Sequence, residues 1–175
     1  MMSSIADIRK DYRLQSLNEA DARSPFELFD KWWKEALDAQ IEEVNAMTLA
    51  TASADAVPSA RIVLLKGYDQ KGFVFFTNYN SFKGQQLEEN PRAALIFFWK
   101  ELERQVRITG LVAKTSDQES DDYYHSRPEG SRLGAWASPQ SQVITNRQWL
   151  EENEKQFREK FEGKPVPRPS HWGGF

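Results

Sequence analysis

The chain has 175 residues, of which 39% are hydrophobic and 13% aromatic, enough apolar material for a single domain with a sizeable core. A net charge of −3 without a dense basic segment argues against nucleic-acid binding. The sequence lacks cysteine and has two histidines, so we expect no disulfide, no metal site and a reducing, cytoplasmic location. No apolar run approaches the roughly 20 residues of a membrane span, and the N-terminus lacks the apolar core of a signal peptide.

The first part of the chain predicts an arm, a helix and a strand. Residues 1–23 are polar and mixed in charge, which indicates a mobile or loosely docked arm. Ser24 and Glu27 predict a helix start with a capping box. The core stripe of this helix, of about 16 residues, would be Phe26, Phe29, Trp33, Leu37 and Ile41. Residues 47–52 have the composition of a buried strand.

Two β-rich segments organise the middle of the chain. Residues 57–66 and 72–78 flank a segment with turn residues and predict an antiparallel hairpin. A short helix, entered through Ser81, follows over residues 81–89. Hydroxyls and lysines beside strands and a helix N-terminus suit a phosphorylated ligand. From this segment alone, ordinary strand-end charges explain the cations more simply.

The second half predicts two further strands, over residues 93–99 and 104–115, and a helix that begins with a capping box at Ser116 and ends before Pro128. Residues 130–141 read as a loop, and a long polar helix begins at Thr145. At least five antiparallel strands with inserted helices predict a mainly β fold, a barrel or half-barrel with peripheral helices.

Motifs of several enzyme classes are missing from the sequence: it has no P-loop, no G-x-G-x-x-G, no G-x-S-x-G and no cysteine nucleophile. Two clusters could carry chemistry. The first is cationic and comprises Arg61, Lys66, Lys83, Arg104 and Arg107; the second comprises Tyr123, His125, Arg127, Ser131 and Arg132. The second has the donors of a phosphate monoester site, but compensation of a helix C-terminus explains it equally well.

Six segments together resemble the pyridoxine/pyridoxamine 5′-phosphate oxidase family, in its order and spacing and over nearly the whole chain. They are RIVLLK (61–66), FFTN (75–78), ERQVRITG (103–110), YYHSRP (123–128), GAWAS-QS (134–141) and WGGF (172–175). No single segment is specific, but their combination is.

The resemblance implies an antiparallel split β-barrel that binds FMN at the interface of a homodimer. It implies oxidation of pyridoxamine or pyridoxine 5′-phosphate to pyridoxal 5′-phosphate, with oxygen as the acceptor and hydrogen peroxide as the product. The flavin would supply the redox chemistry, so no catalytic side chain is assigned. Nucleic acid and membrane are not implied as partners.

The resemblance also implies which residues bind. Contacts to FMN would come from Arg61, Ile62, Val63, Leu64, Leu65, Lys66, Phe76, Thr77, Lys83, Gln105, Gln140, Ser141 and Trp172. Substrate contacts would come from Lys66, Tyr123, Arg127 and Ser131, with a weaker match at Arg9 and Tyr12 in a segment that closes over the substrate.

The sequence departs from the family pattern at two places. Phe82 stands where the family usually has arginine, which would remove a charge-assisted contact worth about 1.5–3 kcal/mol. The family also continues past WGGF through strands carrying an R-L-H-D-R-like segment that contacts substrate and flavin. Without those strands, the alternative is a non-catalytic protein that binds FMN or pyridoxal phosphate.

Overall fold

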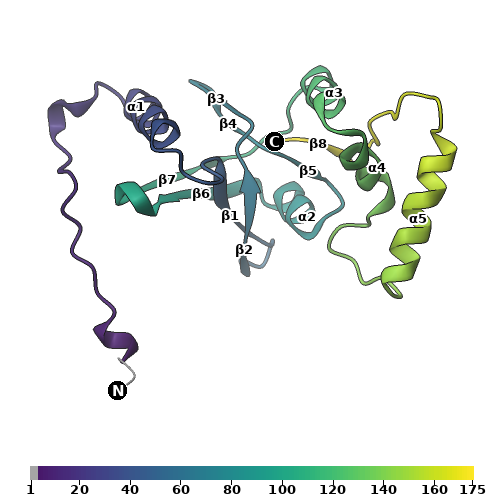
Figure 1. Cartoon of the computed structure of the whole chain (residues 1–175), viewed down its shortest axis with the longest axis horizontal. Coiled ribbons are helices and arrows are strands. Elements are labelled where there is room, and N and C mark those ends of the chain that lie inside the picture. Colours follow the sequence, from purple (N-terminus) through teal and green to yellow (C-terminus); the bar gives the residue numbers. More distant parts are fainter. Residues whose placement is uncertain (1–3) are drawn as a thin grey trace.

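The computed structural model describes residues 4–175 and centres on an antiparallel sheet with strand order β2-β1-β6-β7 (Figure 1). These strands are β1 (Ala46–Ala52), β2 (Pro58–Leu64), β6 (Arg92–Trp99) and β7 (Arg104–Leu111). Two smaller sheets pair β3 (Gly67–Asp69) with β4 (Gly72–Val74), and β5 (Phe76–Asn78) with β8 (Trp172–Gly174). The helices are α1 (Pro25–Asp38), α2 (Phe82–Glu89), α3 (Asp117–Ser126), α4 (Glu129–Ala137) and α5 (Arg147–Lys160).

The core lies between α1 and the inner face of the central sheet. Strand β1 alternates strictly between buried and half-buried residues, as expected of a strand with one covered face. Phe29 of α1 contacts Tyr68, Phe73 and Phe97 edge-on, with ring centroids 4.8 to 5.3 Å apart. This aromatic packing fixes α1 against the sheet and leaves the opposite end of the molecule for α3, α4 and α5 (Figure 1).

The predicted helix over the first apolar stripe is confirmed, with two differences. Ser24 caps α1 by accepting from the Glu27 amide, but the Glu27 carboxylate accepts from Arg23 rather than closing a capping box. Leu37 is half exposed, and Ala36 takes the buried position. The face of α1 that packs on the core is therefore rotated slightly from the predicted face, and it includes Trp32 as well as Trp33.

The predicted central hairpin is wrong in its pairing. Strand β2 pairs with β1 instead, and the hairpin after it is the short β3–β4 unit. The chain leaves the sheet at Leu65, whose side chain enters the core, and the Lys66 amide donates to the carbonyl of Val74. Because the chain leaves the central sheet at this point, β5 does not pair with β2 and is free to pair with β8, near the other end of the sequence.

The predicted loop at residues 130–141 is also wrong, because most of it forms α4. Leu133 and Ala137, four residues apart, are buried on one face of this helix. Gly134 and Pro139 suggested a loop, but Pro139 follows the helix and tertiary packing against α5 overrides the local preference of Gly134. Helix α5 begins at Arg147, two residues after the predicted Thr145, with Asn146 as its cap, and β7 ends at Leu111 rather than residue 115.

The N-terminal arm contacts the body of the protein mainly at Glu103 and at Arg104, which donates to Gln15 Oε1; residues 1–3 of the predicted arm lie outside the described residues. The Glu103 carboxylate accepts from the amides of Arg13 and Leu14 and pairs with Lys10. The rest of the arm is largely exposed and extends away from the body (Figure 1). The mobile or loosely docked arm stays a prediction.

No helix within residues 4–175 combines the length and apolar character needed to cross a membrane. The same described residues contain no group of three or more His, Cys, Asp or Glu side chains arranged to hold a metal ion.

Candidate functional site

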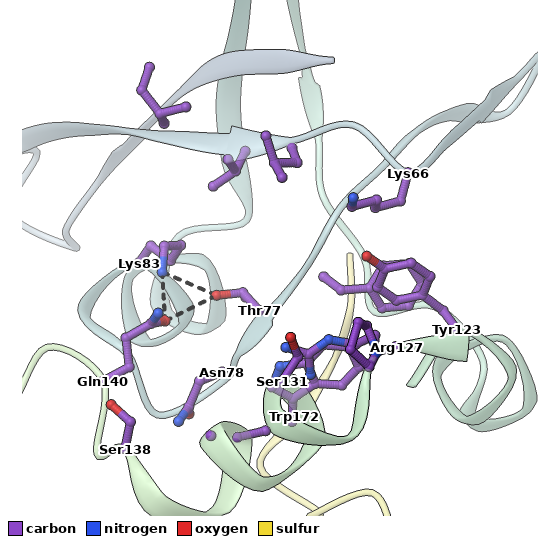
Figure 2. A pocket seen from close by; sticks show the side chains of 17 residues that line it. Lys66, Thr77, Asn78, Lys83, Tyr123, Arg127, Ser131, Ser138, Gln140 and Trp172 are labelled. Atoms are coloured by element: carbon purple, nitrogen blue, oxygen red, sulfur yellow. Dashed lines mark hydrogen bonds between the residues drawn. The ribbon is translucent and has the colours of Figure 1, made fainter. Parts of the chain in front are cut away.

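A hollow of about 640 Å³ opens between β2, β5, the N-terminus of α2 and the α3–α4 junction (Figure 2). Its lining combines an apolar wall from β2 with cations and hydroxyls from the other elements. The lining residues are Ile62, Val63, Leu64, Lys66, Phe76, Thr77, Asn78, Lys83, Tyr123, Arg127, Pro128, Ser131, Gly134, Ala135, Ser138, Gln140 and Trp172. The volume is that of a typical cofactor or ligand site.

One side of the hollow is built around the amine of Lys83, on the first turn of α2. This amine donates to Gln140 Oε1 at 2.9 Å, Thr77 Oγ1 at 3.1 Å and Ser81 Oγ at 3.2 Å. All three acceptors are neutral, and Figure 2 shows the amine pointing between Thr77 and Gln140. Ser81 also caps α2 by accepting from the Gly84 amide, which fixes where the amine can reach.

Arg61 lies behind this side of the hollow rather than in its wall. Its guanidinium donates to Thr51 Oγ1 and Ser59 Oγ, both at 2.6 Å, and more weakly to Gln86 Oε1 at 3.4 Å. These partners come from β1, β2 and α2, so Arg61 joins three elements. Its positive charge nevertheless acts on the Lys83 amine in front of it.

The electrostatics of this side favour an anion. Burial, and then the nearby charge of Arg61, lower the pKa of Lys83 to about 8. Burial likewise lowers the pKa of Arg61. Neither cation has a carboxylate partner within the described part of the chain. A phosphate placed here would relieve both unfavourable effects at once.

The other side of the hollow holds a second pair of cations, Lys66 and Arg127, against aromatic rings (Figure 2). The Arg127 guanidinium lies 4.6 Å from the ring centroid of Trp172, and the Lys66 amine lies 5.7 Å from that of Tyr123. Nη1 of Arg127 is buried and has no hydrogen-bond partner among residues 4–175. Burial lowers the pKa of Arg127, so this group also gains from an anionic ligand.

Most of the predicted site residues lie together around the hollow. Twelve of them line it: Ile62, Val63, Leu64, Lys66, Phe76, Thr77, Lys83, Tyr123, Arg127, Ser131, Gln140 and Trp172. They include residues of five of the six segments that carry the resemblance, all but 103–110. The predicted residues that do not line it are Arg61, Leu65, Gln105, Ser141, Arg9 and Tyr12. Leu65 is buried in the core, whereas Gln105 is exposed on the outer face of β7.

Arg9 and Tyr12 lie on the arm, and Tyr12 lines a different, smaller hollow beneath it.

Five residues that line the hollow were not predicted from the sequence: Asn78, Pro128, Gly134, Ala135 and Ser138. Four of these belong to or adjoin α4, most of which was expected to be a loop, so no helical face could be assigned there. Asn78 directly follows the predicted Thr77 and could have been included on that ground.

The two predicted clusters are divided by the structure. Arg104 lies far from the hollow, paired with Glu35 beneath α1, and Arg107 is exposed on β7. His125 turns away, with its Nδ1 against the carbonyl of Asp121. Arg132 does not line the hollow, although its carbonyl accepts from the Tyr124 hydroxyl. The remaining cations form the two sides described above.

Comparisons with known proteins agree with this geometry. The family model described as pyridoxamine 5'-phosphate oxidase matches residues 33–161. A pyridoxine/pyridoxamine 5'-phosphate oxidase of Trichormus variabilis is 58% identical over 99% of this chain and 82% of its own length. One of Paraburkholderia phymatum is 59% identical with the same coverage.

Solved structures confirm the expected split barrel with peripheral helices. PhzG from Burkholderia lata, in complex with tetrahydrophenazine-1-carboxylic acid, superimposes with a TM-score of 0.83 at 28% identity, covering 89% of this chain and 76% of that one. A pyridoxamine 5'-phosphate oxidase-related, FMN binding protein from Nostoc punctiforme shares the fold, with a TM-score of 0.63 at 15% identity over 87% and 80% of the two chains. The chain therefore belongs to the pyridoxamine 5'-phosphate oxidase family.

Proposed function

We propose that this protein oxidises pyridoxamine or pyridoxine 5′-phosphate to pyridoxal 5′-phosphate with FMN as cofactor. Oxygen is the electron acceptor; the amine substrate also consumes water and releases ammonia, and both substrates yield hydrogen peroxide. The observation that supports this most directly is the pair of cationic sides, Lys83 with Arg61 and Lys66 with Arg127, facing one hollow without carboxylate partners among the described residues. A phosphorylated cofactor and a phosphorylated substrate require two such places.

The residues present fit the flavin on one side. Lys83, Thr77 and Gln140 would hold its phosphate, with Arg61 adding positive charge from behind. The apolar wall of Ile62–Leu64 offers a surface for a flat ring. When bound, FMN would supply the hydride acceptor and the route of the electrons to oxygen.

Lys66, Tyr123, Arg127 and Ser131 fit the substrate phosphate on the other side. The free Nη1 of Arg127 gives that group an unused donor, and Ser131 adds an exposed hydroxyl on the first turn of α4. The lining contains no Asp, Glu or His side chain. We therefore infer that these residues bind and orient, while the cofactor carries out the redox step.

A homodimer is part of the proposal and explains where Gln105 lies. The outer face of the central sheet carries a cross-strand row of Ile62, Thr48, Ile96 and Arg107. Ile62 is 63% exposed and Phe98, opposite Gln105, is 55% exposed. A second copy covering this face would bury them and bring Gln105 near a flavin. Size-exclusion chromatography with light scattering checks the mass.

The test of the function is anaerobic mixing of the FMN-reconstituted protein with pyridoxamine 5′-phosphate while the visible flavin band is recorded. Bleaching that reverses on admission of air, with one equivalent of pyridoxal 5′-phosphate formed per flavin, is the expected result. Retained colour with no product from either substrate would refute the oxidase.

The second candidate is a protein that binds FMN or pyridoxal phosphate without turnover. The observation that supports this candidate is the absence of Asp, Glu and His side chains from the described lining. Tight binding of both ligands without flavin bleaching would favour it, and turnover would exclude it.

A further inference from the structure

The two cations assigned to the substrate phosphate are held by aromatic rings rather than by acids. Phe76, Tyr123 and Trp172 form an aromatic stack in which the three rings lie within 23° of parallel, with centroids 4.1 to 6.1 Å apart. Arg127 lies against Trp172, and Lys66 lies against Tyr123. The rings restrict where the cations can go without neutralising them, which leaves their charge available to a ligand.

The position of Arg127 thus depends on the position of Trp172. Trp172 lies on β8, a strand of three residues that pairs only with β5 in the described structure. Arg127, in contrast, is the C-terminal cap of α3. Arg127 and Trp172 therefore belong to two separate elements, and their contact requires that α3 and β8 keep a fixed position relative to each other.

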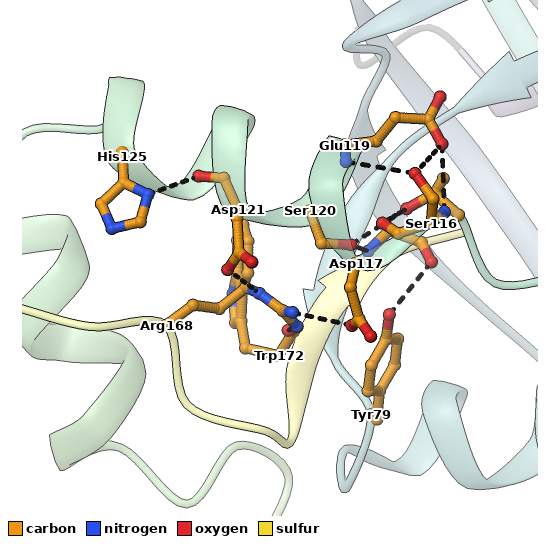
Figure 3. Close-up of polar contacts among 11 residues, drawn as sticks. Tyr79, Ser116, Asp117, Glu119, Ser120, Asp121, His125, Arg168 and Trp172 are labelled. Atoms are coloured by element: carbon orange, nitrogen blue, oxygen red, sulfur yellow. Dashed lines mark hydrogen bonds and ion pairs between the residues drawn. The ribbon is translucent and has the colours of Figure 1, made fainter.

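Arg168 connects these two elements (Figure 3). Its Nε donates to Asp121 at 2.6 Å and its Nη2 to Asp117 at 2.8 Å, and both carboxylates lie on α3. Its Nη1 donates to the backbone carbonyl of Trp172 at 2.8 Å. The Arg168 side chain is only 11% exposed, whereas its partners Asp117 and Asp121 are 94% and 43% exposed, so the guanidinium is covered and the carboxylates remain in contact with water.

The charge of Arg168 is already satisfied. Hydrogen bonds to Asp121, and then to Asp117, raise the pKa of Arg168 against the opposing effect of burial. Because two carboxylates neutralise it, Arg168 is not itself a phosphate ligand. It does not line the hollow either, so its influence on a ligand must be transmitted through other residues.

We propose that Arg168 is a positioning residue for substrate phosphate: it ties the Trp172 backbone to α3 and thereby holds Arg127 in place. The inference rests on the proposed function, since it assumes that Arg127 binds that phosphate. No other described side chain contacts both α3 carboxylates and the Trp172 carbonyl. The guanidinium is needed because its planar fork reaches three acceptors, which a lysine amine cannot do in this geometry.

The experiment measures equilibrium binding, by calorimetry, of pyridoxal 5′-phosphate to the FMN-loaded protein and of FMN to the ligand-free protein. Arg168→Lys keeps the charge but loses the fork. We expect it to weaken pyridoxal 5′-phosphate binding about tenfold and FMN binding less than twofold. The matched control is Arg158→Lys on α5, where an exposed arginine pairs with Glu154, and both affinities should stay unchanged.

A double-mutant cycle separates positioning from general stability. In the Arg127→Ala background, Arg168→Lys should change pyridoxal 5′-phosphate affinity less than twofold, because the group it positions is gone. Full additivity of the two substitutions, or equal losses for pyridoxal 5′-phosphate and FMN, would overturn the inference.

Asp121→Asn provides a second route if Arg168→Lys does not fold. It removes one anchor of Arg168 at the exposed edge of α3 and should weaken pyridoxal 5′-phosphate binding about threefold, again without an effect on FMN. Unchanged pyridoxal 5′-phosphate affinity would contradict the inference. Wild-type protein that binds FMN but not pyridoxal 5′-phosphate would instead refute the proposed function, and the inference with it.

Discussion

Arg104 and Arg127 have similar surroundings at opposite ends of the molecule. Each guanidinium lies against a tryptophan ring, Arg104 at 4.9 Å from Trp32 and Arg127 at 4.6 Å from Trp172. Each also has a buried Nη1 with no hydrogen-bond partner within residues 4–175. The difference is that Arg104 pairs with Glu35 and Gln15, whereas Arg127 has no acidic partner in the same range.

A structural arginine differs from an arginine that can bind a ligand by whether a carboxylate already pairs with it, and not by how deeply it is buried. Arg104 with Glu35 holds β7 against α1 and leaves little charge for anything else. Arg127 keeps its charge and faces a hollow. The sequence placed both in candidate clusters because it does not show which carboxylate, if any, lies opposite.

The largest effect is expected for Arg127→Ala. Loss of a charge-assisted phosphate contact should raise the Michaelis constant for pyridoxamine 5′-phosphate about 100-fold, while FMN affinity changes little. Steady-state kinetics and flavin titration of the same preparation measure both. Equal losses of substrate and flavin binding would show that the two sides of the hollow are assigned wrongly.

Arg104→Met should lower the stability of the protein without lowering its affinity for substrate, the opposite of Arg127→Ala. Removal of this buried partner leaves the Glu35 carboxylate unpaired in a partly covered site, and we expect a loss of about 2 kcal/mol in the free energy of unfolding. Chemical denaturation measures the loss. Substrate affinity should stay within twofold of wild type, and a fall comparable to that of Arg127→Ala would erase the distinction between the two arginines.

Lys83→Met tests the flavin side of the hollow. FMN affinity should fall about twentyfold with the loss of the charged donor. The ligand-free protein should become more stable at pH 7, because the pKa of Lys83 is lowered by burial and the charged amine is unfavourable in the folded state. Flavin titration and thermal unfolding check the two results; a less stable ligand-free variant would contradict the second.

The same amine predicts a pH dependence of FMN binding. With a pKa of about 8, Lys83 loses its proton above that pH in the ligand-free protein, so FMN affinity should fall about fivefold between pH 8 and pH 9. Flavin fluorescence titration measures it. Lys83→Arg keeps the charge through this range and should remove the dependence; persistence of the full effect in that variant would assign it to another group.

Phe82→Arg should give the smallest change. Phe82 is the first residue of α2, half exposed and adjacent to Ser81 and Lys83. A cation there adds charge beside the proposed flavin phosphate in contact with water, so FMN affinity should rise two- to threefold, by about 0.5 kcal/mol. Phe82→Leu is the control for loss of the ring, and an equal gain in it would exclude the charge as the cause.

Elements set by local sequence were predicted well. The Ser116 capping box opens α3 as expected, and the alternation along β7 places Gln105 and Arg107 on one exposed face. The strand β1 and the helix α2 follow from runs of apolar residues and from caps. In each case, the residues that decide the structure lie within a few positions of one another.

Features that depend on contacts between residues far apart in the sequence were not predicted from the sequence pattern. Pairing of β2 with β1 rather than with the following strand depends on Leu65 turning into the core. Helix α4 packs against α5, where Trp136 contacts Phe157 and Phe161, residues that lie more than 20 positions away. For the site, the resemblance supplied most of the lining residues, but it did not show that Arg61 acts from behind Lys83 or that Arg168 holds Trp172.

The pairing of β5 with β8 has a consequence for how the protein acquires its site. Thr77 and Trp172, which line the same hollow, lie far apart in sequence and are brought together by this short ladder. During synthesis, the central sheet can form well before β8 emerges from the ribosome, and until then β5 has an unpaired edge. The hollow should therefore be completed after the central sheet, once a long chain loop has closed, so a nascent chain could be folded at its centre before it can bind a ligand.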